Sequence, residues 1–196
     1  MQIELCYETG YLAALYGIGL SYGLTSKMRF DEFRHSSAND LRKKLHSIAL
    51  NLIKKGEGED KFLRQMAVCF IIRAPRYWWT QMDTYKVGTT AQSESTMHTI
   101  MRKEILREDF EIPLADIRLD SIIDLLNVSR EARDFHTLIR MLPQSYVQRR
   151  IWSANYAVLR NIFIQRAGHP LSEWRKFIDT VSHLVMYPEF LPCRTQ

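Results

Sequence analysis

The stretch LPQSYVQRRIWSANYAVLRNIFIQR, residues Leu142–Arg166, decides the fold that we expect for this chain. Pro143 breaks any preceding helix, because its ring removes a backbone donor and clashes with the helix interior. The residues Tyr146–Ser153 are predicted to form a short extended piece. The residues Asn155–Arg166 are predicted to form a helix. The stretch therefore indicates a break, a strand and a helix in succession.

The predicted helix carries polar groups on the face that it has to bury. At helical spacing, a single face presents Asn155, Leu159, Ile162, Phe163 and Arg166. A buried guanidinium is costly unless acceptors or an anion meet it. Arg166 therefore has two interpretations: it forms a structural salt bridge, or it is directed at the phosphate or the electron-rich ring of a ligand.

The composition is that of an ordinary globular protein. With 196 residues there is enough chain for a sizeable core, and we expect a single domain over residues 1–196. Hydrophobic residues make up 46% and charged residues 25%, which argues against global disorder. The net charge of +5 would suit a pocket for phosphorylated ligands, but a mild basic excess is also a common solubility feature.

The cysteines indicate a reducing compartment. Cys6, Cys69 and Cys193 are far apart in the sequence, and no Cys-x-x-Cys pair occurs. This argues against a structural zinc site and against a disulfide framework, so we expect a cytoplasmic protein. The histidines show no metal-ligand spacing, and no metal site is expected. The apolar segment Tyr11–Leu20 is too short to span a membrane.

The rest of the chain predicts helices around a small sheet. Strands are expected at Met1–Tyr7 and Phe62–Arg73, the second ended by Pro75. Ser37 or Asn39 is expected to cap an amphipathic helix that ends at Gly56. The other expected helices are Tyr11–Tyr22, Arg76–Lys86, Thr96–Leu106, Leu119–Val128, Ser129–Met141 and Pro170–Tyr187. The predicted fold class is α+β: a helix-rich single domain around a small, mainly antiparallel sheet.

A polar segment in the middle of the chain is a second candidate for function. Val87–Ser95 is expected to be irregular, and the sequence KVGTTAQSESTMH over Lys86–His98 combines a cation, hydroxyls, a carboxylate and an imidazole. Its glycine and hydroxyl groups could bind an anion, although the spacing is not that of a P-loop. The alternative is an ordinary loop followed by a capped helix.

These segments together resemble the flavin-dependent thymidylate synthases. Leu142-Pro143, Tyr146, Trp152-Ser-Ala-Asn155 and Arg166 are similar to that family's C-terminal signature, with Trp174 in the place of its later tryptophan. Ser93–His98 is similar to the end of the family's defining motif, Asn-Glu-x-Ser-x-Arg. The resemblance covers about Phe62–Leu106 and Met141–Tyr187.

The resemblance implies a reaction, cofactors and an assembly. Enzymes of this family methylate C5 of dUMP to give dTMP without a cysteine nucleophile. They take the carbon from methylenetetrahydrofolate and the hydride from reduced FAD, with NADPH as reductant. Their active sites form between subunits of a homotetramer. By resemblance, we therefore expect a homo-oligomer that binds dUMP or a related pyrimidine nucleotide and binds neither a membrane nor nucleic acid.

The resemblance also assigns roles to individual residues. Arg166 corresponds to the catalytic arginine that pairs with the uracil and favours its N3-deprotonated form. The cofactor-binding set consists of Lys86, Glu94, Asn155 and Asn161. The substrate-binding set consists of Asp83, Lys86, Glu94, Ser95, Thr96, His98, Arg140 and Arg166, with Thr96 and His98 at positions that hold the nucleotide phosphate.

Several positions depart from the family pattern and leave two alternatives open. Lys86-Val87-Gly88 stands where the family has Arg-His-Arg, Ala157 where it has arginine, and His98 where it has arginine. The first alternative is a relative without flavin that binds or modifies a pyrimidine deoxynucleotide. The second is a non-catalytic nucleic-acid-binding or scaffold protein that uses basic and aromatic residues such as those at Arg76–Trp79.

Overall fold

The structure is a computed structural model that describes residues 1–56, 58–112 and 116–192, so Cys193 lies outside the described residues. The chain divides into two compact units. The first contains Met1–Glu4, Ile71–Lys86 and Ala91–Trp152. The second contains Leu5–Phe70, Val87–Thr90 and the chain from Ser153 onward. Within the described ranges, no helix is both long enough and apolar enough to cross a membrane.

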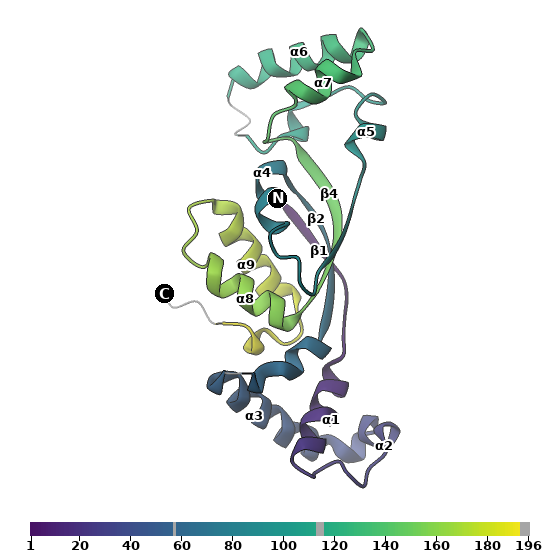
Figure 1. Ribbon diagram of the computed structural model, residues 1–196, viewed down its shortest axis with the longest axis vertical. Coiled ribbons are helices and arrows are strands. Elements are labelled where there is room, and N and C mark those ends of the chain that lie inside the picture. The colour runs from purple at the N-terminus through teal and green to yellow at the C-terminus, as the bar shows by residue number, and fades with distance from the viewer. Residues whose placement is uncertain (57, 113–115, 193–196) are drawn as a thin grey trace. The chain divides into compact units, whose positions relative to one another are not determined.

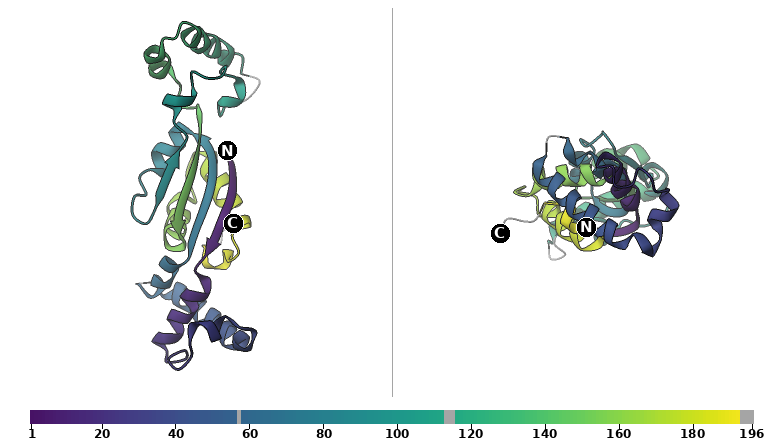
Figure 2. Two further views of the ribbon diagram at one scale, coloured as in Figure 1. Left: turned by 90° about the vertical axis from the view of Figure 1, so that its right-hand side faces the viewer. Right: turned by 90° about the horizontal axis from the view of Figure 1, so that it is seen from below.

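Four strands form one sheet (Figures 1 and 2). They are β1 (Gln2–Thr9), β2 (Ala67–Pro75), β3 (Thr90–Ser93) and β4 (Val147–Asn155), in the order β1-β2-β4-β3. Arg76 N donates to Tyr146 O, and Tyr156 N donates to Met66 O. Along β2 the residue numbers rise from Met66 to Arg76, while those of their partners on the β4 side fall from Tyr156 to Tyr146, so β2 and β4 are antiparallel.

The predicted fold class is confirmed: the chain is helix-rich around a small antiparallel sheet. The strands expected at the N-terminus and after Pro143 are present as β1 and β4. Pro75 ends β2 as expected. The single domain over residues 1–196 stays a prediction.

The second unit contains most of the helices. They are α1 (Tyr11–Ser21), α2 (Phe30–Arg34), α3 (Asn39–Lys55), α8 (Tyr156–Arg166) and α9 (Ser172–Leu184), and α8 and α9 lie side by side (Figure 1). Short 3-10 turns occur at Ser36–Ala38, Glu59–Gln65 and Pro188–Phe190.

Glycine is required where β1 meets α1. Gly10 has a φ of 92°, and a Cβ at this position would lie 2.0 Å from the carbonyl oxygen of Gln65. An L-residue with a side chain would suffer both the left-handed backbone and this clash. The chain can therefore turn from β1 directly into α1 only because residue 10 has no side chain.

Two expectations for the second unit are wrong. The N-cap of α3 is Ala38, which makes no side-chain cap, because Ser37 already belongs to the preceding 3-10 turn and Asn39 begins the helix. The strand expected from Phe62 begins only at Ala67, since Glu59–Gln65 is a 3-10 helix. A short apolar run cannot be assigned to strand or helix from its pattern alone.

The first unit has its own hydrophobic cluster. Its helices are α4 (Arg76–Met82), α5 (Thr96–Thr99), α6 (Arg118–Glu131) and α7 (Phe135–Met141), with a 3-10 turn at Arg107–Asp109. The helices α6 and α7 pack against each other (Figure 1). The buried members of the cluster are Ile100, Ile105, Phe110, Leu119, Leu126, Leu138, Leu142 and Tyr146.

Hydrogen bonds explain why two helices of this unit differ from expectation. The helix expected to reach Leu106 ends at Thr99, and the Asn127 side chain bonds both the N–H and the carbonyl of Ile105. Ser129 does not cap a new helix: α6 continues through it, and its hydroxyl donates to Leu125 O.

The other differences lie at the caps and at the sheet edge. Asp134, whose carboxylate accepts from Thr137 N at 3.0 Å, is the N-cap of α7. The helix after Pro75 ends at Met82 and not at Lys86. The segment expected to be irregular contains the edge strand β3, whose four residues are all exposed and give no alternating pattern.

A pair of neighbouring leucines in α6 tests the importance of this cluster. Leu126 is 1% exposed and Leu125 is 56% exposed. We expect Leu126→Ala to lower the free energy of unfolding by about 2 to 5 kcal/mol, because it leaves a cavity in the cluster. The control, Leu125→Ala, should change it by about 0.5 kcal/mol or less. Urea unfolding of both variants measures the two free energies. Equal losses in Leu126→Ala and Leu125→Ala would contradict the view that the buried cluster stabilises this unit.

Candidate functional site

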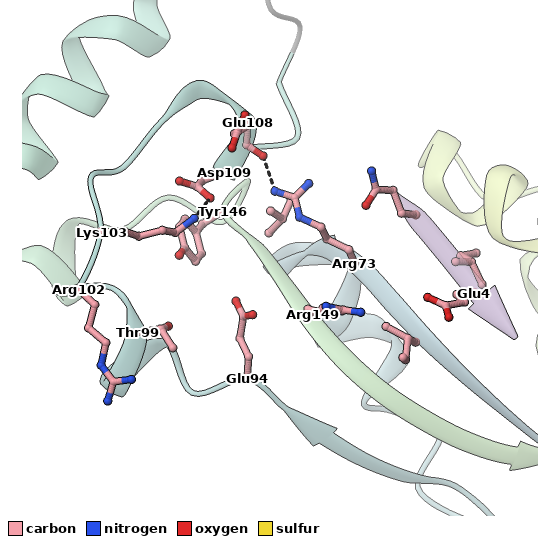
Figure 3. Close-up of a pocket in the computed structure, with 14 residues that line it drawn as sticks. Glu4, Arg73, Glu94, Thr99, Arg102, Lys103, Glu108, Asp109, Tyr146 and Arg149 are labelled. Atoms are coloured by element: carbon pink, nitrogen blue, oxygen red, sulfur yellow. Dashed lines mark hydrogen bonds and ion pairs between the residues drawn. The ribbon is translucent and has the colours of Figure 1, made fainter. Parts of the chain in front are cut away.

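The first unit contains a pocket of about 1000 Å³ on one face of the sheet (Figure 3). Its charged wall comes from several elements: Glu4 from β1, Arg73 from β2, Arg149 from β4, and Lys103 and Asp109 from the chain after α5. Glu94, which follows β3 directly, also belongs to this wall. A pocket that brings cations and carboxylates together in this way suits a polar ligand that carries both an anionic group and hydrogen-bond donors.

Glu94 is the one member of the predicted site sets that lines this pocket. Its backbone N–H donates to Arg149 O at 2.9 Å, which fixes the residue against β4. Figure 3 shows its side chain directed into the pocket, on the side where Tyr146 and Lys103 lie. Glu94 itself is exposed, so its carboxylate is accessible to a ligand.

Tyr146 forms a buried, neutral part of the pocket wall and is 3% exposed. Burial, together with the nearby carboxylates of Asp109 and Glu94, raises the pKa of its phenol to about 12, while Arg73 opposes this shift. The phenol therefore remains a hydrogen-bond donor throughout the neutral pH range. The sequence marked Tyr146 as part of a signature but assigned it no role.

An ion pair between the exposed Lys103 and the buried Asp109 lies on one side of the pocket. The Asp109 carboxylate accepts from Lys103 Nζ at 2.7 Å and from Leu106 N at 3.0 Å. Asp109 is 5% exposed, so these two bonds compensate for removing its charge from water. Arg73 donates to the Glu108 carbonyl. Arg149, in contrast, forms no ion pair with any residue that the structure describes.

A second polar group in the same unit joins two of the predicted substrate ligands. Arg150 donates to the Asp83 carboxylate at 2.9 and 3.0 Å and to Gln148 Oε1 at 3.0 Å. Gln148 Nε2 in turn donates to Thr96 Oγ1 at 2.8 Å. The guanidinium lies 4.4 Å from the centroid of Trp79. Asp83 and Thr96 are thus connected through Gln148 and the largely buried Arg150.

The remaining predicted residues of this unit lie outside the pocket wall. Lys86, His98 and Arg140 are exposed and form no ion pair within the described chain. Ser95 is the N-cap of α5, where its carbonyl, rather than its hydroxyl, accepts bonds from His98 N and Thr99 N. Their roles in substrate binding stay predictions.

The second unit contains Arg166 in the last turn of α8. Its guanidinium lies 4.7 Å from the centroid of Trp174 on α9, a cation–π contact. Arg166 is half-buried. Arg166 is therefore not fully buried as the sequence predicted, but stacks on the tryptophan and remains partly accessible. Its positive charge at the C-terminus of α8 also interacts favourably with the helix dipole.

The two asparagines differ in their surroundings. Asn155 is the N-cap of α8 and not a residue of its face: its Oδ1 accepts from Val158 N at 3.0 Å. Asn161 is exposed, and its Oδ1 accepts from Gln165 Nε2 at 3.1 Å. The Nδ2 group of each asparagine donates to no residue that the structure describes, so each residue can offer its amide nitrogen to a ligand.

The chain at Gly88 lies close to the Asn155 amide. Gly88 has a φ of 74°, and a Cβ there would lie 3.2 Å from Asn155 Nδ2 and 3.2 Å from Val158 Cγ2. The missing side chain therefore keeps the surroundings of this amide open. The neighbouring Val87 is 89% exposed and offers no polar side-chain atom.

The fold is similar to known structures, although the sequence is not. No protein-family model matches the sequence, and no curated protein matches it either. A crystal structure of thymidylate synthase X from Helicobacter pylori with FAD and dUMP is similar with a TM-score of 0.74 and 12% identity, over 96% of this chain and 95% of that one. A second structure of the same enzyme complexed with FAD and dUMP has a TM-score of 0.72 and 12% identity, over 94% of both chains. The predicted resemblance to flavin-dependent thymidylate synthases is thus confirmed at the level of the fold: the chain has the fold of thymidylate synthase X.

Proposed function

We propose that this chain binds dUMP and transfers a one-carbon unit to C5 of the uracil to give dTMP. The observation that carries the proposal is the agreement of the fold, over nearly the whole of both chains, with a thymidylate synthase whose crystals contain FAD and dUMP. The signature stretch Leu142–Arg166 supports it, because it forms the strand β4 and the helix α8 in that fold.

Arg166 is the residue that we assign to the uracil. Its guanidinium is permanently charged and presents its donors in a rigid plane. Contact with the Trp174 ring holds the guanidinium in position. A fixed cation of this kind favours the N3-deprotonated uracil, in which the ring is electron-rich and C5 more nucleophilic.

The pocket of the first unit is assigned to the polar parts of the nucleotide. The Glu94 carboxylate can accept from a sugar hydroxyl or a ring N–H. Arg149 has no ion pair among the described residues and can bind a phosphate. We further propose a homotetramer, as the resemblance to the flavin-dependent thymidylate synthases implies.

FAD fits this chain through a reduced set of contacts. Asn155 and Asn161 offer amide nitrogens, Lys86 a cation and Glu94 a carboxylate, and Gly88 leaves open the surroundings of the Asn155 amide. When bound, reduced FAD would supply the hydride for the reaction. Methylenetetrahydrofolate as carbon donor, NADPH as reductant and the cytoplasm as compartment complete the proposal, and the free Cys6 and Cys69 suit that compartment.

The residues Val87 and Gly88 support a second candidate function. Val87 and Gly88 provide no polar side chain at two positions where the resemblance implies flavin contacts, and Val87 is almost fully exposed. This favours a relative without flavin that binds a pyrimidine deoxynucleotide for another modification. In both candidate functions Arg166 binds the nucleotide, but only the first requires FAD.

Binding of dUMP to the Arg166→Ala variant tests the nucleotide site. We expect at least about a tenfold loss of affinity in calorimetric titration, because a hydrogen-bonded charge partner of the uracil is removed. Lys176→Ala is the matched control, since Lys176 is an exposed cation on α9 and should leave the affinity unchanged. Wild-type affinity in Arg166→Ala would contradict the proposal. Salt-dependent DNA binding that survives the substitution would instead favour a nucleic-acid-binding protein.

Absorbance spectra with and without added FAD test the flavin. We expect purified protein to retain flavin absorbance after gel filtration and to release tritium from 5-tritiated dUMP. Asn155→Asp should weaken FAD binding, because it removes the amide nitrogen but keeps an oxygen to cap α8, so the melting temperature should hardly change. A colourless protein that takes up no added FAD, but still binds dUMP, would exclude the flavin and select the second candidate.

A further inference from the structure

Two cysteines that are far apart in the sequence meet across neighbouring strands of the second unit. Cys6 belongs to β1 and Cys69 to β2, which are adjacent in the sheet (Figures 1 and 2). The register follows from the end of β1, where Gly10 lies against the carbonyl of Gln65. Counting back along β1 and forward along β2 from this contact brings Cys6 to the level of Cys69. Glu4 of β1 and Arg73 of β2 line one pocket, and alternation along each strand then puts Cys6 and Cys69 on that same face of the sheet.

The two cysteines lie close enough for their side chains to interact. Burial raises the pKa of the Cys69 thiol, the neighbouring Cys6 raises it further, and Tyr7 lowers it. Both Cys6 and Tyr7 are exposed, which interrupts the alternation of exposed and less exposed residues in β1. Cys69, in contrast, is 3% exposed. One thiol of the pair is therefore accessible to reagents in solution, and the other lies directly behind it.

We propose that Cys6 and Cys69 are a reversible disulfide site, oxidised by low-molecular-weight disulfides such as oxidised glutathione. Opposite residues of an antiparallel pair have Cβ atoms about 4.5 to 5.5 Å apart, whereas a disulfide prefers about 3.5 to 4.5 Å. The bond therefore requires a small approach of β1 to β2 and carries strain. Strained, accessible disulfides are readily reduced, which is typical of redox-responsive rather than structural bonds.

The order of the two steps follows from accessibility. The Cys6 thiolate attacks one sulfur of oxidised glutathione, forms a mixed disulfide and releases one glutathione thiolate. The Cys69 thiolate then attacks the Cys6 sulfur and releases the second glutathione. Two electrons pass from the cysteines to the oxidant, and the two cysteine protons end on the two glutathione thiols. Burial raises the pKa of the Cys69 thiol, and Cys6 raises it further, which makes Cys69 the resolving and not the attacking thiol.

The bond would join the two ends of a long segment. The residues between Cys6 and Cys69 include α1, α2 and α3, so the disulfide would close a large loop and restrict the unfolded chain. We therefore expect the oxidised protein to melt at a higher temperature than the reduced protein. The same bond would fix the pairing of the edge strand β1 with β2.

The test uses the full chain, incubated with oxidised glutathione and then alkylated without reduction. We expect the Cys193→Ser variant, which retains only this pair of the three cysteines, to lose both alkylatable thiols and to become lighter by two hydrogen atoms. Peptide mapping should identify a Cys6–Cys69 crosslink that dithiothreitol reverses. The melting temperature should be raised by oxidation in this variant.

Cys6→Ser is the companion variant, chosen because Cys6 is exposed and its replacement should not disturb folding. It should show neither the crosslink nor the rise in melting temperature, and its Cys69 should remain reduced. The proposal is overturned if Cys193→Ser stops at a glutathione adduct on Cys6 or keeps both thiols. It is equally overturned if, in the unmodified chain, Cys6 crosslinks to Cys193.

Discussion

The pairing of β2 with β4 is the constraint on which the rest of the structure depends. Backbone bonds at both ends, from Arg76 to Tyr146 and from Tyr156 to Met66, fix the register of these two central strands. A slip of one residue would exchange the faces of every side chain on β4. The alternation along this strand therefore decides that Arg149 belongs to the pocket and that Arg150 belongs to the network with Asp83 and Gln148.

Much of the fold could be predicted because the strongest periodic segments have one clear interpretation. The helix α8 and the strand β1 follow from spacing alone, and the resemblance of the C-terminal stretch to flavin-dependent thymidylate synthases is confirmed in the fold. The errors lie where local patterns carry little information. The edge strand β3 is wholly exposed, and the apolar pair Phe62-Leu63 of the 3-10 helix Glu59–Gln65 stands just before the apolar strand β2, so neither could be recognised from pattern.

The candidate site was less accessible to sequence reasoning than the fold. Glu94 was named, but Tyr146, Lys103 and Asp109 were not assigned to the site, because their chemistry depends on burial and on partners far away in the chain. Arg166 shows the opposite limit. Its position on α8 follows from helical spacing, whereas its contact with Trp174 requires the packing of α9 on α8, which spacing does not give.

The strand order β1-β2-β4-β3 also has a consequence for how the chain is made. β4 lies between β2 and β3, yet it is synthesised after both of them. During synthesis on the ribosome, the edges of β2 and β3 that pair with β4 therefore remain unpaired until Asn155 has emerged. The earlier helices α1, α3 and α4 consist of local contacts and can form during that interval, whereas the sheet is completed only late in synthesis.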